Sequence, residues 1–172
     1  MRYAKFIIIS LLILAAAYLG ISGHPENTDA AETSLISYTY HEDGHAEVVS
    51  CDRNATGVLE IPSSVTVNGV TYSVTKILNN TFYRCTGLTS IEIPASVTVI
   101  EANAFDVCSS LGSFVVSADN TVYSSDDGVQ FNKDKVCLVA FPAGRSGSYD
   151  IPGTVTSVES YLTSNTKSAL HS

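Results

Sequence analysis

A segment of this chain recurs at a step of 23 residues, and that repeat limits the folds open to it. Residues 88–108 are followed by a second copy at 111–116, with apolar residues at equivalent positions. The segment Ile-Glu-Ile-Pro at 91–94 has related copies at 59–62 and 149–152, so that four repeats are visible. A unit this short cannot bury its own apolar face, and successive units must stack. The sequence therefore predicts a solenoid.

Two insertions lengthen the 23-residue step, and both carry signals for β-hairpins. The first contains Asn68-Gly69, a dipeptide typical of two-residue turns because both positions accept positive φ. The second lies near 128–141, where apolar segments flank a polar turn. A third hairpin, at Asp43-Gly44 within residues 35–57, would cap the open end of the stack. We predict a mostly β solenoid of the α/β class, with a short parallel sheet of about four strands and little helix.

Stacking also predicts which apolar residues touch, because residues one repeat apart should pack inside the solenoid. Each fully buried large side chain would contribute about 1.5–3 kcal/mol. Cys85 and Cys108 are equivalent, and we expect them to pack as free thiols, although adjacent repeats would also bring them near disulfide range. A thiol count on the unfolded, unreduced protein distinguishes the two, and four free thiols are expected. The expected pairs are Leu88/Leu111, Ile91/Phe114, Ile93/Val116, Ile100/Val158, Phe82/Phe105 and Cys85/Cys108.

The form Leu-x-x-Ile-x-Ile at residues 88–93 is that of a leucine-rich repeat. Three longer segments extend the pattern: GVLEIPSSVTVNGVTYSVTKI, IPASVTVIEANAFDVCSSL and DGVQFNKDKVCLVAFPAGRSGSYDIPGTVTSV. In these segments the chain resembles the BspA-like (type 5) leucine-rich repeats of secreted and cell-surface proteins. This resemblance covers about residues 36–159. It implies an exported protein that adheres to proteins of a host or a neighbouring cell.

The chain departs from the family pattern at two kinds of position. The Gly usual after the Ile of the turn is replaced by Leu78, Glu101 and Glu159. The fourth repeat has Thr163, Thr166 and Ala169 where Phe, Cys and Leu are expected. This polar ending is typical either of a truncated repeat, which we expect, or of a cap.

The first 34 residues do not fit the repeat. Residues 1–22 combine a basic start with an apolar run shorter than the roughly 20 residues of a spanning helix, which predicts a signal peptide. An uncleaved membrane anchor is the alternative. The polar residues 23–34 are expected to form a linker, and residues 58–172 the repeat domain. The predicted localisation is secreted or cell surface, with membrane contact only through this segment.

Charge narrows the class of partner. The net charge of −8 disfavours phosphate backbones and anionic membranes, so nucleic acid is not an expected partner. The position between the two inward residues of each strand should face solvent. We expect a row of such residues to serve solubility, and the alternative is that it binds a basic protein surface or a weakly held Ca²⁺ ion. The candidate contact residues are Glu60, Glu92, Val115, Asp150 and the neighbouring Tyr149.

The segment His41-Glu42-Asp43-Gly44-His45 matches the zinc-protease motif H-E-x-x-H. That spacing serves catalysis only on a helix, which brings both imidazoles to one face. Asp-Gly is turn chemistry, and the flanking residues alternate as strands do, so a hairpin turn is expected instead. We predict no enzyme activity, catalytic residue, metal or cofactor, with a zinc protease as the least favoured alternative.

Two hypotheses of function follow. The first is a non-catalytic module for protein–protein interaction or adhesion, with a host-matrix or neighbouring-cell protein as partner. The second is a structural spacer, or a truncated fragment of a larger repeat array, and a continuation of the 23-residue pattern in the adjoining coding sequence would favour it.

Overall fold

The computed structural model describes residues 35–159 and the backbone of residues 170–171. The predicted signal peptide (1–22) and linker (23–34) lie outside the described residues, as do Thr163, Thr166 and Ala169. The described part consists of strands and turns without a helix, so it contains no helix that is long and apolar enough to cross a membrane.

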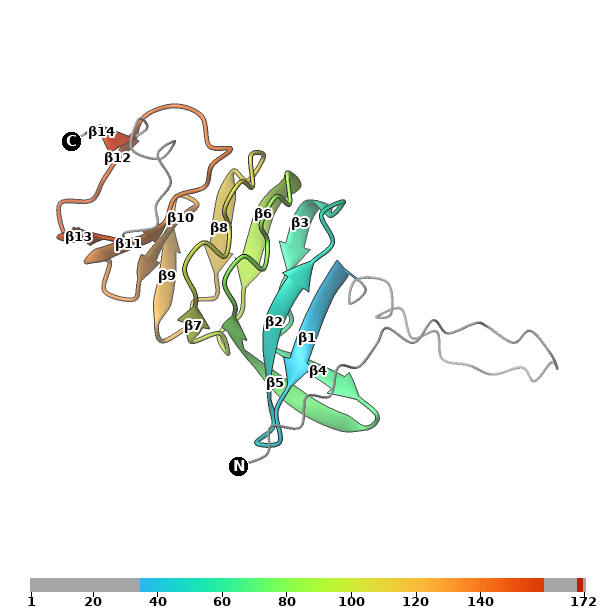
Figure 1. The fold of residues 1–172 in the computed structure, drawn as a ribbon. Coiled ribbons are helices and arrows are strands. Elements are labelled where there is room, and N and C mark those ends of the chain that lie inside the picture. The colour runs from blue at the N-terminus through green and yellow to red at the C-terminus, as the bar shows by residue number, and fades with distance from the viewer. Residues whose placement is uncertain (1–34, 160–169, 172) are drawn as a thin grey trace, which may run out of the picture.

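Short strands succeed one another along the described chain, and Figure 1 shows most of them side by side along one axis. They are β1 (Ile36–Tyr40), β2 (His45–Cys51), β3 (Thr56–Glu60), β4 (Ser64–Val67), β5 (Val70–Ile77), β6 (Gly87–Ile93), β7 (Val99–Ile100), β8 (Ser113–Val116), β9 (Tyr123–Asp126), β10 (Val129–Asn132), β11 (Cys137–Ala140), β12 (Tyr149–Asp150), β13 (Ser157–Val158) and β14 (Leu170–His171).

The repeat builds a parallel sheet of three strands in the order β3-β6-β8. Ile91 of β6 lies between Leu59 of β3 and Phe114 of β8, in the register that the 23-residue step predicts. These three side chains point inward and are almost fully buried. Because strand side chains alternate between faces, the residues that follow them point outward.

A second parallel ladder, β2-β5-β7, lies on the other side of the same core. It pairs β2 with β5 and β5 with β7, and places Val48, Ile77 and Ile100 next to one another. All three belong to the main hydrophobic cluster, together with the inward residues of β3, β6 and β8. In the repeats that begin with β3 and β6, the chain therefore crosses the core and forms a second strand, β5 or β7, on its other side.

The predicted hairpins form where the turn dipeptides lie. β4 and β5 pair antiparallel around Asn68 and Gly69, whose φ angles of 51° and 80° are those required of a two-residue turn. β1 and β2 pair antiparallel around the turn that contains Gly44. β10 and β11 form the hairpin predicted near 128–141, and β9 adds a third antiparallel strand to it.

Residues one repeat apart meet in the core. The rings of Phe82 and Phe105 stack with their centroids 5.5 Å apart, and Phe105 meets Phe114 edge to face at 4.8 Å. Leu88 and Leu111 are buried, as are Cys85 and Cys108. The predicted pair Ile100/Val158 is wrong, because Ile100 lies beside Ile77 while Val158 pairs with Leu138 and is exposed.

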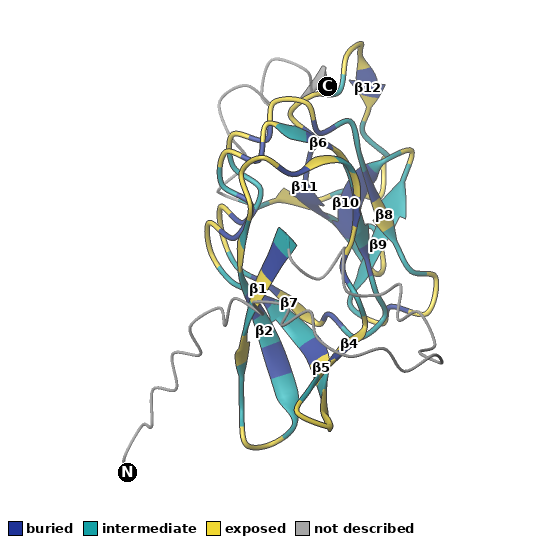
Figure 2. Cartoon of the chain, turned by 90° about the vertical axis from the view of Figure 1, so that its right-hand side faces the viewer, coloured by how far each residue is buried: buried dark blue, intermediate teal, exposed yellow. Residues whose placement is uncertain are grey.

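The prediction of a fourth strand in the main parallel sheet is also wrong. The insertion that contains β9 and β10 packs against the outer edge of β8, where the Phe114 amide donates to the Gly128 carbonyl at 2.8 Å. The Val116 amide donates to Ser125 Oγ at 3.0 Å on the same edge. The fourth copy therefore cannot pair with β8, and its strand β12 pairs with β14 instead. Figure 2 shows β10 and β11 largely buried, and they form a second, smaller core.

The cysteines are free thiols, and three of them influence one another. Burial and the neighbouring Cys85 raise the pKa of Cys51 and of Cys108 to about 12, from 9.0. An unfolded chain would lose these protons near pH 9, whereas the folded chain keeps them. The folded state therefore holds more protons between pH 9 and 12, and its stability must fall as the pH rises through that window.

We expect the urea midpoint to fall between pH 8.5 and pH 10.5, and to fall less in Cys108→Ala, whose thiol no longer titrates. Unfolding followed by circular dichroism at both pH values measures this. Because tyrosines also titrate above pH 10, the quantity to compare is how far the urea midpoint falls between the two pH values in each protein. An equal fall of the urea midpoint in both proteins would contradict the role assigned to Cys108.

Candidate functional site

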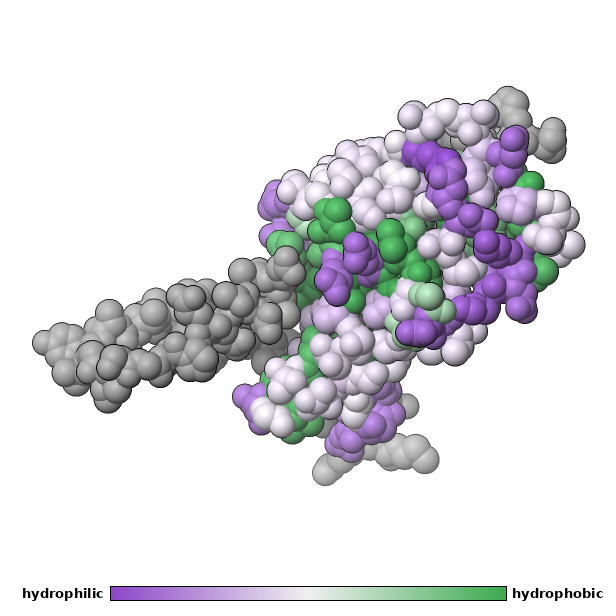
Figure 3. All heavy atoms as spheres, turned by 180° about the vertical axis from the view of Figure 1, so that it is seen from behind, coloured by the Kyte–Doolittle hydropathy of each residue, from purple (hydrophilic) through white to green (hydrophobic). Residues whose placement is uncertain are grey.

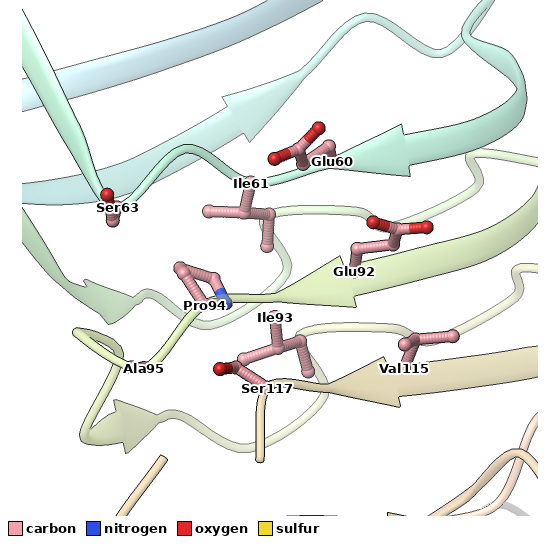
Figure 4. Close-up of a pocket in the computed structure, with 9 residues that line it drawn as sticks. All are labelled: Glu60, Ile61, Ser63, Glu92, Ile93, Pro94, Ala95, Val115 and Ser117. Atoms are coloured by element: carbon pink, nitrogen blue, oxygen red, sulfur yellow. The ribbon is translucent and has the colours of Figure 1, made fainter. Parts of the chain in front are cut away.

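The exposed side of the β3-β6-β8 sheet carries the row of residues predicted from the sequence. Glu60 pairs in register with Glu92, and Glu92 with Val115, so that these side chains stand next to one another on three strands. Figure 4 shows both carboxylates pointing away from the core, with Val115 on the following strand. Adjacent strands lie about 4.8 Å apart, so the two like charges repel. No ion pair within residues 35–159 involves either carboxylate.

A second row lies two residues earlier on each strand. Val58 pairs with Ser90, and Ser90 with Ser113, whose hydroxyl donates to Ser90 Oγ at 3.0 Å. Sequence reasoning missed this row, although the period of two residues that predicted Glu60 also leads to Val58. Both rows together are called the open face here. Its residues are Val58, Glu60, Ser90, Glu92, Ser113 and Val115.

The open face is partly apolar. Val58 and Val115 are 63% and 48% exposed on this face. Figure 3 shows one side of the molecule on which hydrophobic atoms gather between hydrophilic ones. The open face thus carries both exposed valine and carboxylate side chains.

A shallow pocket lies where the strands of the open face end. Figure 4 shows its walls, which come from the last residues of β3, β6 and β8 and from the turns that follow. The two carboxylates stand at its rim. The lining residues are Glu60, Ile61, Ser63, Glu92, Ile93, Pro94, Ala95, Val115 and Ser117.

Two predicted contact residues do not belong to the open face. Asp150 lies on β12, which pairs with β14, and it is exposed there. Tyr149 is buried against Phe141, with their ring centroids 5.7 Å apart, and the Arg145 guanidinium lies over its ring. The insertion at the edge of β8 separates both residues from the row to which the repeat count assigned them, so their inclusion in one surface was wrong.

The H-E-x-x-H segment forms a turn between β1 and β2, as predicted. The Gly44 amide donates to the His41 carbonyl at 3.1 Å and the His41 amide to the His45 carbonyl at 2.9 Å, which closes the loop. Glu42 is exposed in this turn. The helix that the zinc-protease motif needs is therefore not formed.

Stacked parallel strands of a 23-residue unit around one core define a leucine-rich repeat protein. The family model for the BspA type leucine rich repeat region, which contains six copies, matches residues 63–170. The chain therefore belongs to this family of bacterial surface-type repeat proteins. Leucine-rich repeat proteins in general bind other proteins and are in general not enzymes.

Several solved structures resemble this chain. A leucine-rich repeat protein from Eubacterium ventriosum is 19% identical, with a TM-score of 0.47, over 74% of this chain and 54% of its own. A leucine rich cell surface protein from Faecalibacterium prausnitzii is 20% identical, with a TM-score of 0.46, over 72% and 40%. A leucine-rich repeat protein from Bacteroides capillosus is 25% identical, with a TM-score of 0.46, over 75% and 94%.

The chain thus spans 54% and 40% of the first two proteins. The search of curated proteins gave no match.

Proposed function

We propose that this chain is an exported, non-catalytic module that binds a protein partner at the cell surface through its open face. The observation that carries this proposal is the row of Glu60, Glu92 and Val115, which lie in register on three adjacent strands. The row combines two acidic groups with exposed apolar area on a rigid sheet. A rigid surface loses little conformational entropy when it binds.

Electrostatics favour a basic partner. The two glutamates repel each other in the free protein, and a cationic side chain placed between them would relieve that repulsion. The net charge of −8 adds long-range attraction for such a partner and speeds its association at low salt. We therefore propose a basic patch on a matrix or neighbouring-cell protein as the ligand.

Export is part of this proposal. It is supported by the basic and apolar start of the chain at residues 1–22 and by membership of the family. The cap role of the β1–β2 hairpin also stays a proposal, supported by the position of the hairpin before the first repeat.

The full-length chain can be immobilised and tested against a panel of purified basic and acidic extracellular proteins by surface plasmon resonance. We expect saturable binding to a basic member, weakened at least tenfold by Glu92→Lys. Asp150→Lys is the matched control, because it makes the same charge change at an exposed carboxylate outside the open face, and its affinity should change less than twofold.

Equal losses in the two variants would show a net-charge effect rather than a site. Binding that is insensitive to both would exclude the open face, and the absence of saturable binding would favour the spacer hypothesis.

A further inference from the structure

Three side chains capable of holding a metal ion converge at the β1–β2 hairpin. One ligand atom from each of His41, His45 and Glu47 lies within 4.8 Å of the other two. His45 and Glu47 are two residues apart on β2 and therefore share a face. His41 lies at the other end of the turn, directly after β1. Glu42, the glutamate of the sequence motif, is not a member of this cluster.

The nitrogen of His41 that faces the cluster has no hydrogen-bond partner. Although the ring is partly exposed, its Nε2 atom is buried. Glu47 Oε2 lies 3.3 Å from this nitrogen, which is within ion-pair distance, but their geometry is not that of a hydrogen bond. Two ligand atoms on a tetrahedral zinc ion are separated by about 3.3 Å, given bond lengths of about 2.0–2.2 Å. The pair therefore already has the spacing of metal ligands.

The second histidine contacts two neighbouring side chains, His41 and Asp43. The rings of His41 and His45 stack with centroids 4.1 Å apart and planes 9° apart. Nδ1 of His45 contacts the carboxylate of Asp43. A histidine that gives its Nδ1 proton to a carboxylate keeps the lone pair of Nε2 free for a metal, and this arrangement is common around zinc. Because the two ring planes are nearly parallel, the rings would have to leave the stack and turn toward each other before both nitrogens could bind one ion.

One cation competes for this site. Nζ of Lys76 lies 3.7 Å from Glu47 Oε1, but its closer partner is Glu101 Oε1 at 2.6 Å. A metal bound at Glu47 would leave Lys76 with Glu101. The lysine should therefore weaken metal binding without preventing it.

We propose that His41, His45 and Glu47 form a zinc-binding site on the first hairpin, with water at the fourth position. Two imidazoles and one carboxylate suit Zn²⁺, whereas Ca²⁺ requires six or more oxygen ligands that the hairpin does not supply. The site differs from the sequence prediction that the chain binds no metal. It is independent of the open face and requires no catalysis.

Isothermal titration calorimetry on the metal-free full-length chain tests the proposal, with ZnCl₂ as ligand and CaCl₂ as comparison. We expect one zinc ion per chain and no Ca²⁺ binding at the hairpin, so that excess CaCl₂ does not lower the affinity for zinc. His41→Ala, His45→Ala and Glu47→Gln should each lower zinc affinity at least tenfold. Glu42→Gln is the matched control, because it changes an adjacent glutamate outside the cluster, and it should leave affinity unchanged.

Lys76→Met gives a test that loss of folding cannot imitate, since removal of the competing ammonium group should raise zinc affinity severalfold. Zinc should also raise the urea midpoint of the natural chain but not that of His45→Ala. Bound Co²⁺ should show no thiolate charge-transfer band, which separates this site from the buried cysteines.

The proposal is overturned if no zinc binds stoichiometrically, or if zinc binds and the three ligand substitutions leave its affinity unchanged. A thiolate band in the Co²⁺ spectrum would assign the metal to cysteine and overturn it equally.

Discussion

Replacement of Phe114 by alanine is expected to cost about 3–5 kcal/mol of unfolding free energy, the usual cost of deleting a buried phenyl ring. Phe114 is 1% exposed and packs edge to face with Phe105, which in turn stacks on Phe82. Its removal opens a cavity where three repeats meet. Because neighbouring strands hold the backbone of β8 on both sides, the surrounding atoms cannot move in to fill the cavity without breaking other contacts. Urea unfolding followed by circular dichroism measures the loss.

Val115→Ala is the control for this prediction. Val115 is the next residue on β8, but it points outward and is 48% exposed. Its truncation should change stability by about 0.5 kcal/mol or less. If the two substitutions cost the same, equivalent residues of successive repeats do not form the core, and the assignment of inward and outward positions on β8 would be wrong.

Asn120→Ala is expected to cost about 3 kcal/mol or more, because each buried polar group left unpaired costs about 1–3 kcal/mol. The Asn120 side chain is fully buried. Its Nδ2 donates to the carbonyls of Pro94 and Val97, both at 2.8 Å. Its Oδ1 accepts from the amides of Val122 at 2.9 Å and Tyr123 at 2.8 Å. One side chain thus joins the turn after β6 to the start of β9.

Asn120→Asp separates the two halves of this network. It keeps the acceptor for Val122 and Tyr123 but removes both donors and buries a charge, so it should destabilise the protein at least as much as alanine does. The exposed neighbour Asp119→Ala is the control and should be close to neutral. The same urea titration measures all three variants, and a nearly neutral Asn120→Ala would contradict the bridging role.

The register of the main sheet could be predicted from the sequence because it follows from counting. The 23-residue step sets Ile91 beside Phe114 and Glu92 beside Val115, and both pairs occur. The turn at Asn68-Gly69 could be predicted because its backbone angles restrict residue choice. In these places one local signal determines the structure, and no distant contact competes with it.

Counting failed beyond the second insertion. The fourth copy repeats the sequence pattern, but its strand β12 does not pair with β8 as expected. The inserted strands β9 and β10 occupy that edge of β8 instead. A repeat pattern gives the spacing of equivalent residues but not the position of an inserted hairpin. That position depends on contacts such as those of Asn120, whose sequence signal is an ordinary turn.

The metal cluster was missed for a related reason. The motif H-E-x-x-H pairs the two histidines with Glu42, which lies beside the metal only when the segment is a helix. In a hairpin the side chains that share a face are two residues apart, so the carboxylate beside His45 is Glu47. The same two histidines therefore point to a different third ligand once the backbone is extended.

The inserted strands at β8 also affect how molecules of this protein meet. An uncovered strand edge can accept a strand from another copy, which is a common start of aggregation and fibre growth. Here the amides of Phe114 and Val116 already have partners within the chain. Self-association by strand addition at β8 would first have to displace its own hairpin, so the insertion protects this side of the protein from polymerisation.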